Sequence, residues 1–319
     1  MAKVSVIIPC YKAAEFVEKC LRSLEGQTYR DFDVIMVDDC SPDNSAAVVA
    51  AYAATSSLEI VYLKNEKNSG PAVSRNNAIA ASRAEYVCFC DSDDWYDADY
   101  LEKMVTAADA NGADMVICGY KVAFTDGRTI EHPVEWSQRE PERKAVLTAP
   151  IDALWSVMVK RELAARYPLP DLRNGEDMAI IPVWAMHAER FGIVPCGIYN
   201  YLLRGDSLSN KSNPGITDSI EKSFAYTMEF YEEEYRTELE FLGVRNMIYG
   251  ALLNLFKCGW YPQRAREILE AFEKSFPNWK RNGYLAALPV YKRVFVKCAA
   301  GRFFAAVWVL AKIHGLLAR

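Results

Sequence analysis

Acidic side chains follow two short apolar runs within the first hundred residues. Asp38 and Asp39 come after the run 34–37, and residues 91–94 (Asp-Ser-Asp-Asp) come after the run 86–90. Clustered carboxylates repel one another, so such a group implies a bound cation or a hydrogen-bonding ligand. The alternative is that these side chains cap the helices that follow, which suits Asp43 or Asp97 better than the whole group. The sequence therefore predicts a ligand or cation site.

The elements around these acids alternate between strand and helix patterns. Strands are expected at 4–8, 33–38, 58–63, 85–90 and 114–120, and helices at 15–24, 45–52, 70–82 and 100–111. This alternation predicts an α/β fold, with a mainly parallel sheet flanked by helices. Ligands of such sheets bind at the carboxyl ends of the strands, where the acids stand.

Beyond residue 125 the pattern changes. Helices are expected at 151–164 and 177–189 and a strand at 193–202, followed by helices at 216–242, 244–258, 263–276 and from 290 to the end. The turn 210–215, which contains Asn213-Pro214-Gly215, is the best boundary candidate. We therefore expect a first domain over 1–210, with halves 1–120 and 121–210, and a helical C-terminal extension over 211–319.

The charge of the chain is unevenly distributed. Its 319 residues are 51% hydrophobic and 25% charged, typical of globular proteins, and the net charge of −5 argues against a nucleic-acid partner. Residues 274–319 hold nine Lys or Arg and no Asp or Glu, which leaves −14 for residues 1–273. Aromatic residues are mixed with this basic segment. We expect residues 274–319 to contact an anionic membrane surface, unless they form a packing helix whose basic residues only face water.

Three features bear on location. The nine cysteines form no CxxC pair, so their spacing suggests neither a disulfide framework nor a zinc site and favours a reducing compartment. The N-terminus has no long apolar run of the kind that a secretory signal requires. The apolar stretch 303–317 is interrupted by Lys312 and His314 and falls short of the roughly 20 residues that span a bilayer. These observations predict a cytoplasmic protein.

Four ordered motifs in the first half resemble those of the family-2 glycosyltransferases, which have the GT-A fold. They are residues 4–11 (VSVIIPCY), 37–43 (VDDCSPD), 68–76 (NSGPAVSRN) and 91–95 (DSDDW). Each is weak alone, but their order and spacing make the resemblance specific over about the first 120 residues. The family usually has Asn and Gly where this sequence has Lys12 and Cys40.

The resemblance implies a nucleotide-sugar site in the half 1–120. Pro9 and Tyr11 are expected to line the base, and Asp39 to accept a hydrogen bond from uracil. The remaining donor contacts are expected from Arg75, Asp91 and Ser92. For Arg75, a solvated position on a helix is the alternative.

The resemblance also implies a divalent cation, Mn²⁺ or Mg²⁺, held by Asp93 and Asp91 through the diphosphate of the donor. Hard cations of this kind prefer oxygen ligands, and phosphates commonly complete their coordination shell. Such an ion neutralises charge on the departing nucleoside diphosphate.

The half 121–210 carries a weaker resemblance to the acceptor side of bacterial members. Its segment 173–177 (RNGED) resembles their Glu-Asp motif, which makes Asp177 the expected catalytic base and Glu176 an orienting or acceptor-binding residue. Trp155 is an expected acceptor contact, and Arg204 and Ser207 are expected in a loop over the donor. The alternative for Asp177 is a carboxylate that stabilises the start of a helix, and for Arg204 and Ser207 a surface turn.

Together these expectations describe an inverting hexosyl- or related transferase. It would move a sugar from a nucleotide donor, UDP-linked by preference, to a glycan or lipid-linked acceptor in cell-surface polysaccharide synthesis at the inner face of the cell membrane. A nucleotidyltransferase is the first alternative, but residues 9–14 are not the Gly-rich basic loop it would need. A non-catalytic nucleotide-binding protein of related fold is the second, but Asp93 and Asp177 are both present.

Overall fold

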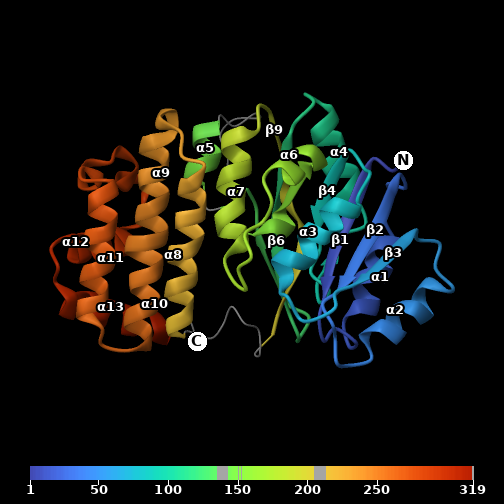
Figure 1. Cartoon of the computed structure of the whole chain (residues 1–319), viewed down its shortest axis with the longest axis horizontal. Helices are drawn as coiled ribbons and strands as arrows, with labels where there is room; N and C mark the ends of the chain where they lie inside the picture. Colours follow the sequence, from blue (N-terminus) through green and yellow to red (C-terminus); the bar gives the residue numbers. More distant parts are fainter. Residues whose placement is uncertain (135–142, 150, 152, 205–212, 318–319) are drawn as a thin grey trace. The chain divides into compact units, whose positions relative to one another are not determined.

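The computed structural model describes residues 1–134, 143–149, 151, 153–204 and 213–317 (Figure 1). The chain divides into two compact units. Unit 1 comprises Met1–Arg143 and Ile151–Gly205, and unit 2 comprises Lys144–Pro150 and Asp206–Arg319. The predicted boundary between residues 210 and 211 lies outside the described residues.

Unit 1 is built on one sheet, which has nine strands in the described part of the chain. The strands are β1 (Val4–Cys10), β2 (Phe32–Asp38), β3 (Ile60–Lys64), β4 (Tyr86–Phe89), β5 (Trp95–Tyr96), β6 (Met115–Phe124), β7 (Thr129–His132), β8 (Val157–Lys160) and β9 (Phe191–Leu203). Their order is β3-β2-β1-β4-β8-β6-β9-β5, with β7 paired to β6. The predicted α/β fold is confirmed.

The two halves of this sheet differ in strand direction. From β3 to β4 all neighbours are parallel, as expected from the alternating pattern. Strand β8 then pairs antiparallel with both β4 and β6, and β5 pairs antiparallel with β9, so the sheet as a whole is mixed. The helix expected at 151–164 is wrong. Its segment Val157–Lys160, apolar and buried in its first three residues, is the strand β8, and only α6 (Arg161–Arg166) is α-helical.

Helices cover both faces of the sheet. They are α1 (Val17–Glu25), α2 (Ser45–Ala53), α3 (Pro71–Ala81), α4 (Tyr100–Asp109), α6 and α7 (Glu176–His187). Alternate residues of β1, such as Val6 and Ile8, share one buried cluster with apolar residues of α1 and α4. On the other face, Trp184 of α7 stacks on Phe89 of β4 with ring centroids 6.0 Å apart. Strand alternation therefore fixes which helix covers which face.

The carboxyl ends of β1 and β2 lie opposite each other, and β4 ends three residues before the end of β1. Cys10 at the end of β1 pairs with Asp38 at the end of β2, and Ile7 pairs with Phe89 at the end of β4. The amide of Asp39 donates to the Cys10 carbonyl over 2.8 Å, and the amide of Cys90 donates to the Ile7 carbonyl over 3.0 Å. Both acidic segments therefore begin at the same edge of the sheet.

Unit 2 is helical in its described part. Its elements are α5 (Arg143–Thr148, which starts in unit 1), α8 (Pro214–Glu229), η3 (Glu233–Tyr235), α9 (Arg236–Gly243), η4 (Val244–Ala251), α10 (Leu252–Cys258), α11 (Pro262–Ser275), η5 (Trp279–Arg281), η6 (Gly283–Ala287), α12 (Val290–Ala300) and α13 (Phe304–Leu317). The single helix expected over 216–242 is broken after Glu229. Element η4 is a π-helix that joins α9 to α10. None of the described helices combines the length and the apolar character needed to cross a bilayer.

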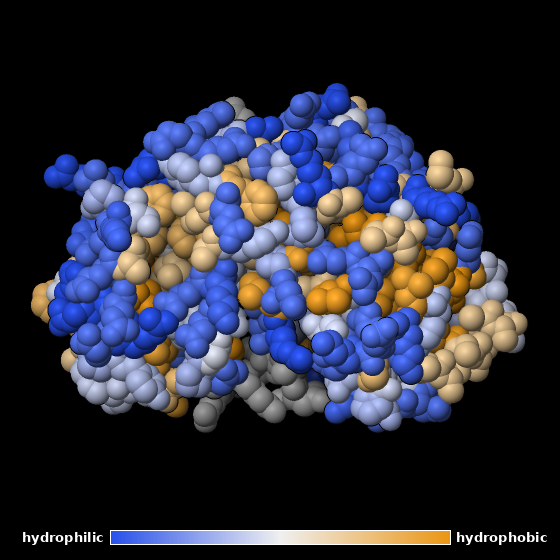
Figure 2. Space-filling model, in the orientation of Figure 1, coloured by the Kyte–Doolittle hydropathy of each residue, from blue (hydrophilic) through white to orange (hydrophobic). Residues whose placement is uncertain are grey.

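The two units expose apolar groups in different places. In unit 1, Val61 and Tyr62 of the edge strand β3 are exposed, and Figure 2 shows orange side chains gathered over the part of this unit that holds β1–β3. In unit 2, several exposed apolar side chains belong to α12 and α13, among them Tyr291, Val294 and Ile313.

Candidate active site

Asp39 organises the backbone beside the end of β2. Its Oδ1 accepts hydrogen bonds from Asn65 Nδ2 and the Ser69 amide, both at 2.8 Å, and its Oδ2 accepts one from the Gly70 amide at 2.7 Å. The side chain is buried. An ionised carboxylate has about four acceptor positions, so these three bonds leave room for about one more. Its predicted contact with uracil stays a prediction, and the structure adds a second role, which is to hold the loop before α3.

Two residues near this loop adopt left-handed backbone angles. Lys12 has φ 53° and Cys40 has φ 59°. Gly and Asn adopt this region at lower cost than other residues. The two positions where the sequence departs from the Asn and Gly of the resembling family are therefore positions where the backbone favours Asn or Gly.

Arg75 joins the two halves of unit 1. Its Nη2 donates to Asp91 Oδ1 over 2.7 Å, and its Nη1 donates to Glu176 Oε1 over 2.6 Å. Burial would lower the pKa of the Arg75 guanidinium, but the charges of Asp91, Glu176 and Asp177 outweigh burial and raise this pKa. The alternative of a solvated helix position is wrong, because the Arg75 side chain is buried. Its predicted contact with the nucleotide stays untested.

Asp177 lies at the start of α7, next to Glu176. Gly175 precedes the helix with φ 85°, a left-handed angle that suits glycine. The Met178 amide donates to Asp177 Oδ1 over 2.8 Å, so one carboxylate oxygen stabilises the first turn of the helix. Asp177 is half-buried, whereas Glu176 is buried. The structure thus brings the predicted base close enough to act electrostatically on Arg75.

The remaining acids of residues 91–94 have different partners. Asp93 forms an ion pair with Arg204 over 2.9 Å, and both side chains are partly exposed. Asp94 is buried, where its Oδ2 accepts from the Tyr199 hydroxyl over 2.6 Å and its Oδ1 from the Leu202 amide over 2.7 Å. Burial, followed by the charges of Asp91 and Asp93, raises the pKa of the Asp94 carboxyl. Asp94 therefore anchors β9 beneath the acidic segment.

Tyr199 contributes to the site although the sequence motifs did not assign it a role. It is fully buried, accepts a hydrogen bond from the Asp91 amide over 3.2 Å, and stacks on Trp155 with ring centroids 4.5 Å apart. Trp155, the expected acceptor contact, also stacks on Tyr201. Tyr199 and Tyr201 are two residues apart in a predicted strand, so their side chains share one face. This spacing was the signal in the sequence.

The other predicted residues lie around the same edge. Tyr11 follows β1 with 43% of its surface exposed, Pro9 is half-buried in β1, and Ser92 is buried between Asp91 and Asp93. Ser207 lies outside the described residues. The available ligands fit a hard divalent cation, because Asp91 and Asp93 offer partly exposed carboxylate oxygens and a bound diphosphate would add more. Among the described residues, no group of three or more His, Cys, Asp or Glu could hold a metal without such a ligand.

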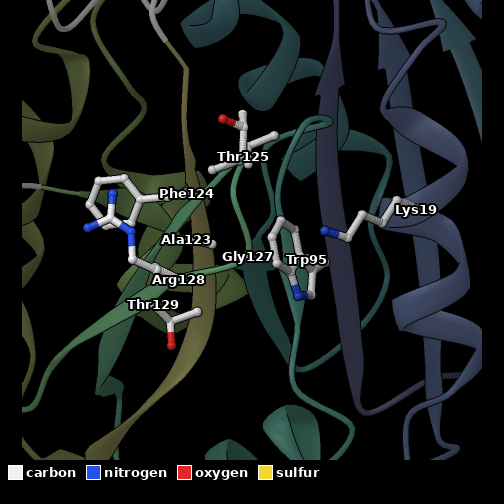
Figure 3. A pocket seen from close by; sticks show the side chains of 9 residues that line it. Lys19, Trp95, Ala123, Phe124, Thr125, Gly127, Arg128 and Thr129 are labelled. Atoms are coloured by element: carbon white, nitrogen blue, oxygen red, sulfur yellow. The ribbon is translucent and has the colours of Figure 1, made fainter.

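A cavity of about 360 Å³ lies beside β5 in unit 1 (Figure 3). Lys19 Nζ reaches to 2.9 Å from the centre of the Trp95 ring. Residues between Ala123 and Thr129 complete the lining, and the side chains of Phe124 and Arg128 lie against each other on the side away from Trp95 (Figure 3). Burial lowers the pKa of Lys19. The cavity adjoins the acidic segment through Trp95, but Asp93 and Asp177 do not line it.

Comparison with known proteins decides the family. The sequence profile described as Glycosyl transferase family 2 matches residues 5–165. The uncharacterized glycosyltransferase EpsJ of Bacillus subtilis is 30% identical over 240 residues, which cover 72% of this chain and 69% of EpsJ. The chain belongs to glycosyl transferase family 2. The predicted family and enzyme class are confirmed, and the nucleotidyltransferase and non-catalytic alternatives are not favoured.

Solved structures show the same fold for this family-2 glycosyltransferase. A crystal structure of Staphylococcus aureus TarS in complex with UDP-GlcNAc matches with a TM-score of 0.74 at 20% identity, covering 98% of this chain and 91% of that one. The mannosyltransferase PcManGT of Pyrobaculum calidifontis, in complex with GDP-Man and Mn²⁺, matches with a TM-score of 0.63 at 19% identity over 99% of this chain and 88% of that one. The GT-A fold predicted from the motifs is confirmed.

The buried ion bridge predicts a large loss of stability for Arg75→Ala. Removing one partner of a buried ion pair leaves uncompensated charge, so the free energy of unfolding should fall by about 3–5 kcal/mol. Arg22→Ala is the control, because Arg22 pairs with Glu18 on the exposed face of α1, where a pair contributes about 0.3–0.5 kcal/mol. Urea unfolding followed by circular dichroism measures both. Equal losses in the two variants would show that the buried Arg75 bridge stabilises the protein no more than an exposed ion pair does.

The left-handed angle at Cys40 predicts opposite effects of two substitutions. Cys40→Gly should raise the free energy of unfolding by about 1 kcal/mol because it removes the steric cost of φ 59°. Cys40→Val should lower it, because β-branched residues tolerate this region least. Cys196→Gly, in strand β9, is the control and should lower stability by about 0.5–1 kcal/mol. Thermal unfolding in which Cys40→Val is more stable than Cys40→Gly would contradict this explanation.

Proposed function

We propose that this glycosyltransferase moves a sugar, with inversion, from a UDP-linked donor to a glycan or lipid-linked acceptor of the cell surface. The observation that carries the proposal is the Arg75 bridge, which links Asp91 at the end of β4 to Glu176 beside Asp177. The donor-side and acceptor-side carboxylates therefore belong to one charged network. TarS, whose structure was solved with UDP-GlcNAc, supports the choice of UDP.

Asp177 is the proposed general base. Its carboxylate takes the proton of the acceptor hydroxyl as the acceptor oxygen bonds to the anomeric carbon. The bond from that carbon to the diphosphate oxygen breaks, and the electron pair leaves with UDP. A single base suits this one-step inversion. Asp177 already accepts the Met178 amide through Oδ1, which fixes the carboxylate relative to the start of α7.

The remaining proposed residues bind and orient the donor. Asp39 keeps about one acceptor position for the uracil N–H, and its three internal bonds hold the carboxylate in place. Tyr11 and Pro9 are available to pack against the base, and Ser92 and Asp91 stand at the sugar side. Arg204, which pairs with Asp93, is the proposed contact for the diphosphate. These roles are proposals from position.

A divalent cation, Mn²⁺ or Mg²⁺, is the proposed cofactor, with Asp93 and Asp91 as its protein ligands. When bound, the ion would neutralise charge that develops on the leaving diphosphate. The partly exposed carboxylate oxygens of both residues support this ligand set, and PcManGT was solved with Mn²⁺. Arg204 and Arg75 balance the same two carboxylates in the structure.

The proposed setting is the cytoplasmic face of the cell membrane. Among the relatives, TarS of Staphylococcus aureus is named a poly(ribitol-phosphate) β-N-acetylglucosaminyltransferase and is 25% identical over 219 residues, 66% of this chain and 37% of its own. Cell-surface polymers of this kind suggest a glycan or lipid-linked acceptor. The nine Lys and Arg of residues 274–319 support contact with an anionic leaflet.

Substitution of two acids separates donor binding from transfer. Asp177→Asn should lower kcat by roughly 10²–10⁴ while leaving UDP affinity unchanged, because it removes the base but keeps an acceptor oxygen for Met178. Asp93→Ala should instead abolish the part of donor binding that depends on the metal. Calorimetry with UDP and Mn²⁺, with and without chelator, measures binding, and UDP release from a panel of UDP-sugars measures turnover.

Asp171→Asn is the matched control, since Asp171 is exposed on the segment before α7. It should leave both measurements unchanged. Near-normal turnover of Asp177→Asn with acceptor present would refute the base assignment. Chelator-insensitive donor binding in the unmodified protein would refute the metal proposal without affecting the base.

Membrane association is tested by vesicle co-sedimentation of the full chain. Arg293→Ala combined with Lys297→Ala, both on α12, should weaken binding to phosphatidylglycerol vesicles by about 30-fold, since each basic residue contributes roughly 1 kcal/mol at an anionic surface. Lys64→Ala with Lys67→Ala removes the same charge from an exposed region of unit 1 and should change little. Equal binding by both double variants, or binding that high salt does not weaken, would contradict the proposal.

A further inference from the structure

The remaining hydrogen-bonding capacity of Asp39 is confined to one of its two oxygens. Oδ1 accepts two hydrogen bonds, from Asn65 Nδ2 and the Ser69 amide, whereas Oδ2 accepts one, from the Gly70 amide. Each oxygen of an ionised carboxylate has about two acceptor positions. Within the described part of the chain, Oδ1 is therefore fully used and the remaining position belongs to Oδ2. A ligand that bonds to Asp39 must bring an N–H or O–H group to Oδ2.

The Asn65 side chain sets this occupancy, and Asn77 sets the orientation of Asn65. Asn65 Nδ2 donates to Asp39 Oδ1 over 2.8 Å and to the Ser74 hydroxyl oxygen over 3.0 Å. Its Oδ1 accepts a hydrogen bond from Asn77 Nδ2 over 2.9 Å. Asn65 and Ser74 are buried, whereas Asn77 is exposed on α3. The three side chains Asn77, Asn65 and Asp39 therefore form a relay that runs from the surface to the carboxylate.

The relay is satisfied in only one orientation of the Asn65 amide. If this amide were turned over, its oxygen would face the Asp39 carboxylate and its amino group would face the donor of Asn77. Two acceptors would then oppose each other in a buried place, and leaving buried polar groups unpaired costs free energy. The bond from Asn77 therefore keeps the amino group of Asn65 directed at Asp39.

A fixed carboxylate discriminates between bases that a turning carboxylate would both accept. Uracil has an N–H at N3, where cytosine has only a lone pair. The amino group of cytosine lies at the neighbouring ring position, and a carboxylate that can turn is able to follow it. Asp39 is held by three bonds, so its open position stays where the N3 of uracil would meet it. Sites whose buried polar groups are held in this way reject a ligand that lacks the matching donor.

We infer that Asn65 and Asn77 are positioning residues that make Asp39 selective for uracil over cytosine. The inference rests on the UDP-linked donor proposed above and names the residues that set its base. Asn65 occupies Oδ1 of Asp39 and leaves only Oδ2 open, and Asn77 keeps the Asn65 amide in the orientation that does so. Both residues act through Asp39, without a contact of their own to the base.

The ratio of UDP affinity to CDP affinity tests this inference, because the two nucleotides differ only in the base. Calorimetry on the full chain with excess Mn²⁺ measures both affinities. We expect the unmodified protein to bind UDP at least about tenfold more tightly than CDP, since a hydrogen bond to a charged group is worth a factor of this size. Equal affinity of the unmodified protein for UDP and CDP would overturn the inference.

Asn65→Leu keeps the approximate volume of the side chain and removes its two donors. It should bind UDP about tenfold more weakly and prefer UDP over CDP by no more than about threefold, because Asp39 is then able to turn. A substitution that only loosened the fold would weaken both nucleotides alike. An unchanged ratio in Asn65→Leu would therefore contradict a positioning role. Thermal unfolding checks that the variant is folded.

Two substitutions of the exposed Asn77 keep the test decisive if Asn65→Leu does not fold. Asn77→Asp places an acceptor opposite Asn65 Oδ1, so the Asn65 amide should turn over and present its oxygen to Asp39. We expect the preference for UDP to fall about tenfold in Asn77→Asp and less than about threefold in Asn77→Ala, where the bonds to Asp39 and Ser74 still hold the amide. Asn278→Asp makes the same exchange at an exposed position of unit 2 and is the control. An equal ratio in Asn77→Asp and in this control would overturn the relay.

The same measurements separate this inference from the proposal it rests on. If the unmodified protein binds neither UDP nor CDP, the proposed donor itself is wrong. If it prefers UDP, and Asn65→Leu and Asn77→Asp keep that preference in full, the UDP-linked donor stands and the positioning role is wrong.

Discussion

The arrangement of the candidate site depends on one buried cation. Arg75 lies between Asp91 and Glu176 with donor–acceptor distances of 2.7 and 2.6 Å. Its partners come from opposite halves of unit 1, one after β4 and one at the start of α7. A buried guanidinium with two carboxylates fixes both in direction as well as in distance. The pair Glu176 and Asp177 is therefore held against the sheet edge by charge as well as by the packing of α7.

Two further carboxylates keep that edge in place. Asp39 gathers three donors from the segment before α3, and α3 carries Arg75. Asp94 fastens β9 through Tyr199 and Leu202. Asp39 and Asp94 therefore use most of their hydrogen-bond acceptor positions within the protein. The side chains of Asp91, Asp93 and Asp177 are more exposed to solvent, so they are better placed to contact a ligand.

The sequence predicted the parallel half of the sheet well, because each of its strands is an apolar run followed by a helix with clear spacing. It failed at β8, since the apolar run Val157–Val159 is only three residues long and so short a run fits a buried helix as well as a strand. The bridge from Arg75 to Glu176 was beyond prediction. The two residues are 101 positions apart, and no local pattern records which distant charge a buried arginine will meet. The order of the motifs located the carboxylates in the sequence. The packing of the fold determines which partner each carboxylate has.

The most direct measurement is a crystal structure of the chain with an intact, non-hydrolysable UDP-sugar and Mn²⁺. The account predicts that the anomeric carbon faces the Asp177 carboxylate across the acceptor position, with Arg75 still joining Asp91 and Glu176 and the uracil bonded to Asp39. A donor bound with its anomeric carbon turned away from Asp177, or an Arg75 released from Glu176 to bind the diphosphate, would contradict it.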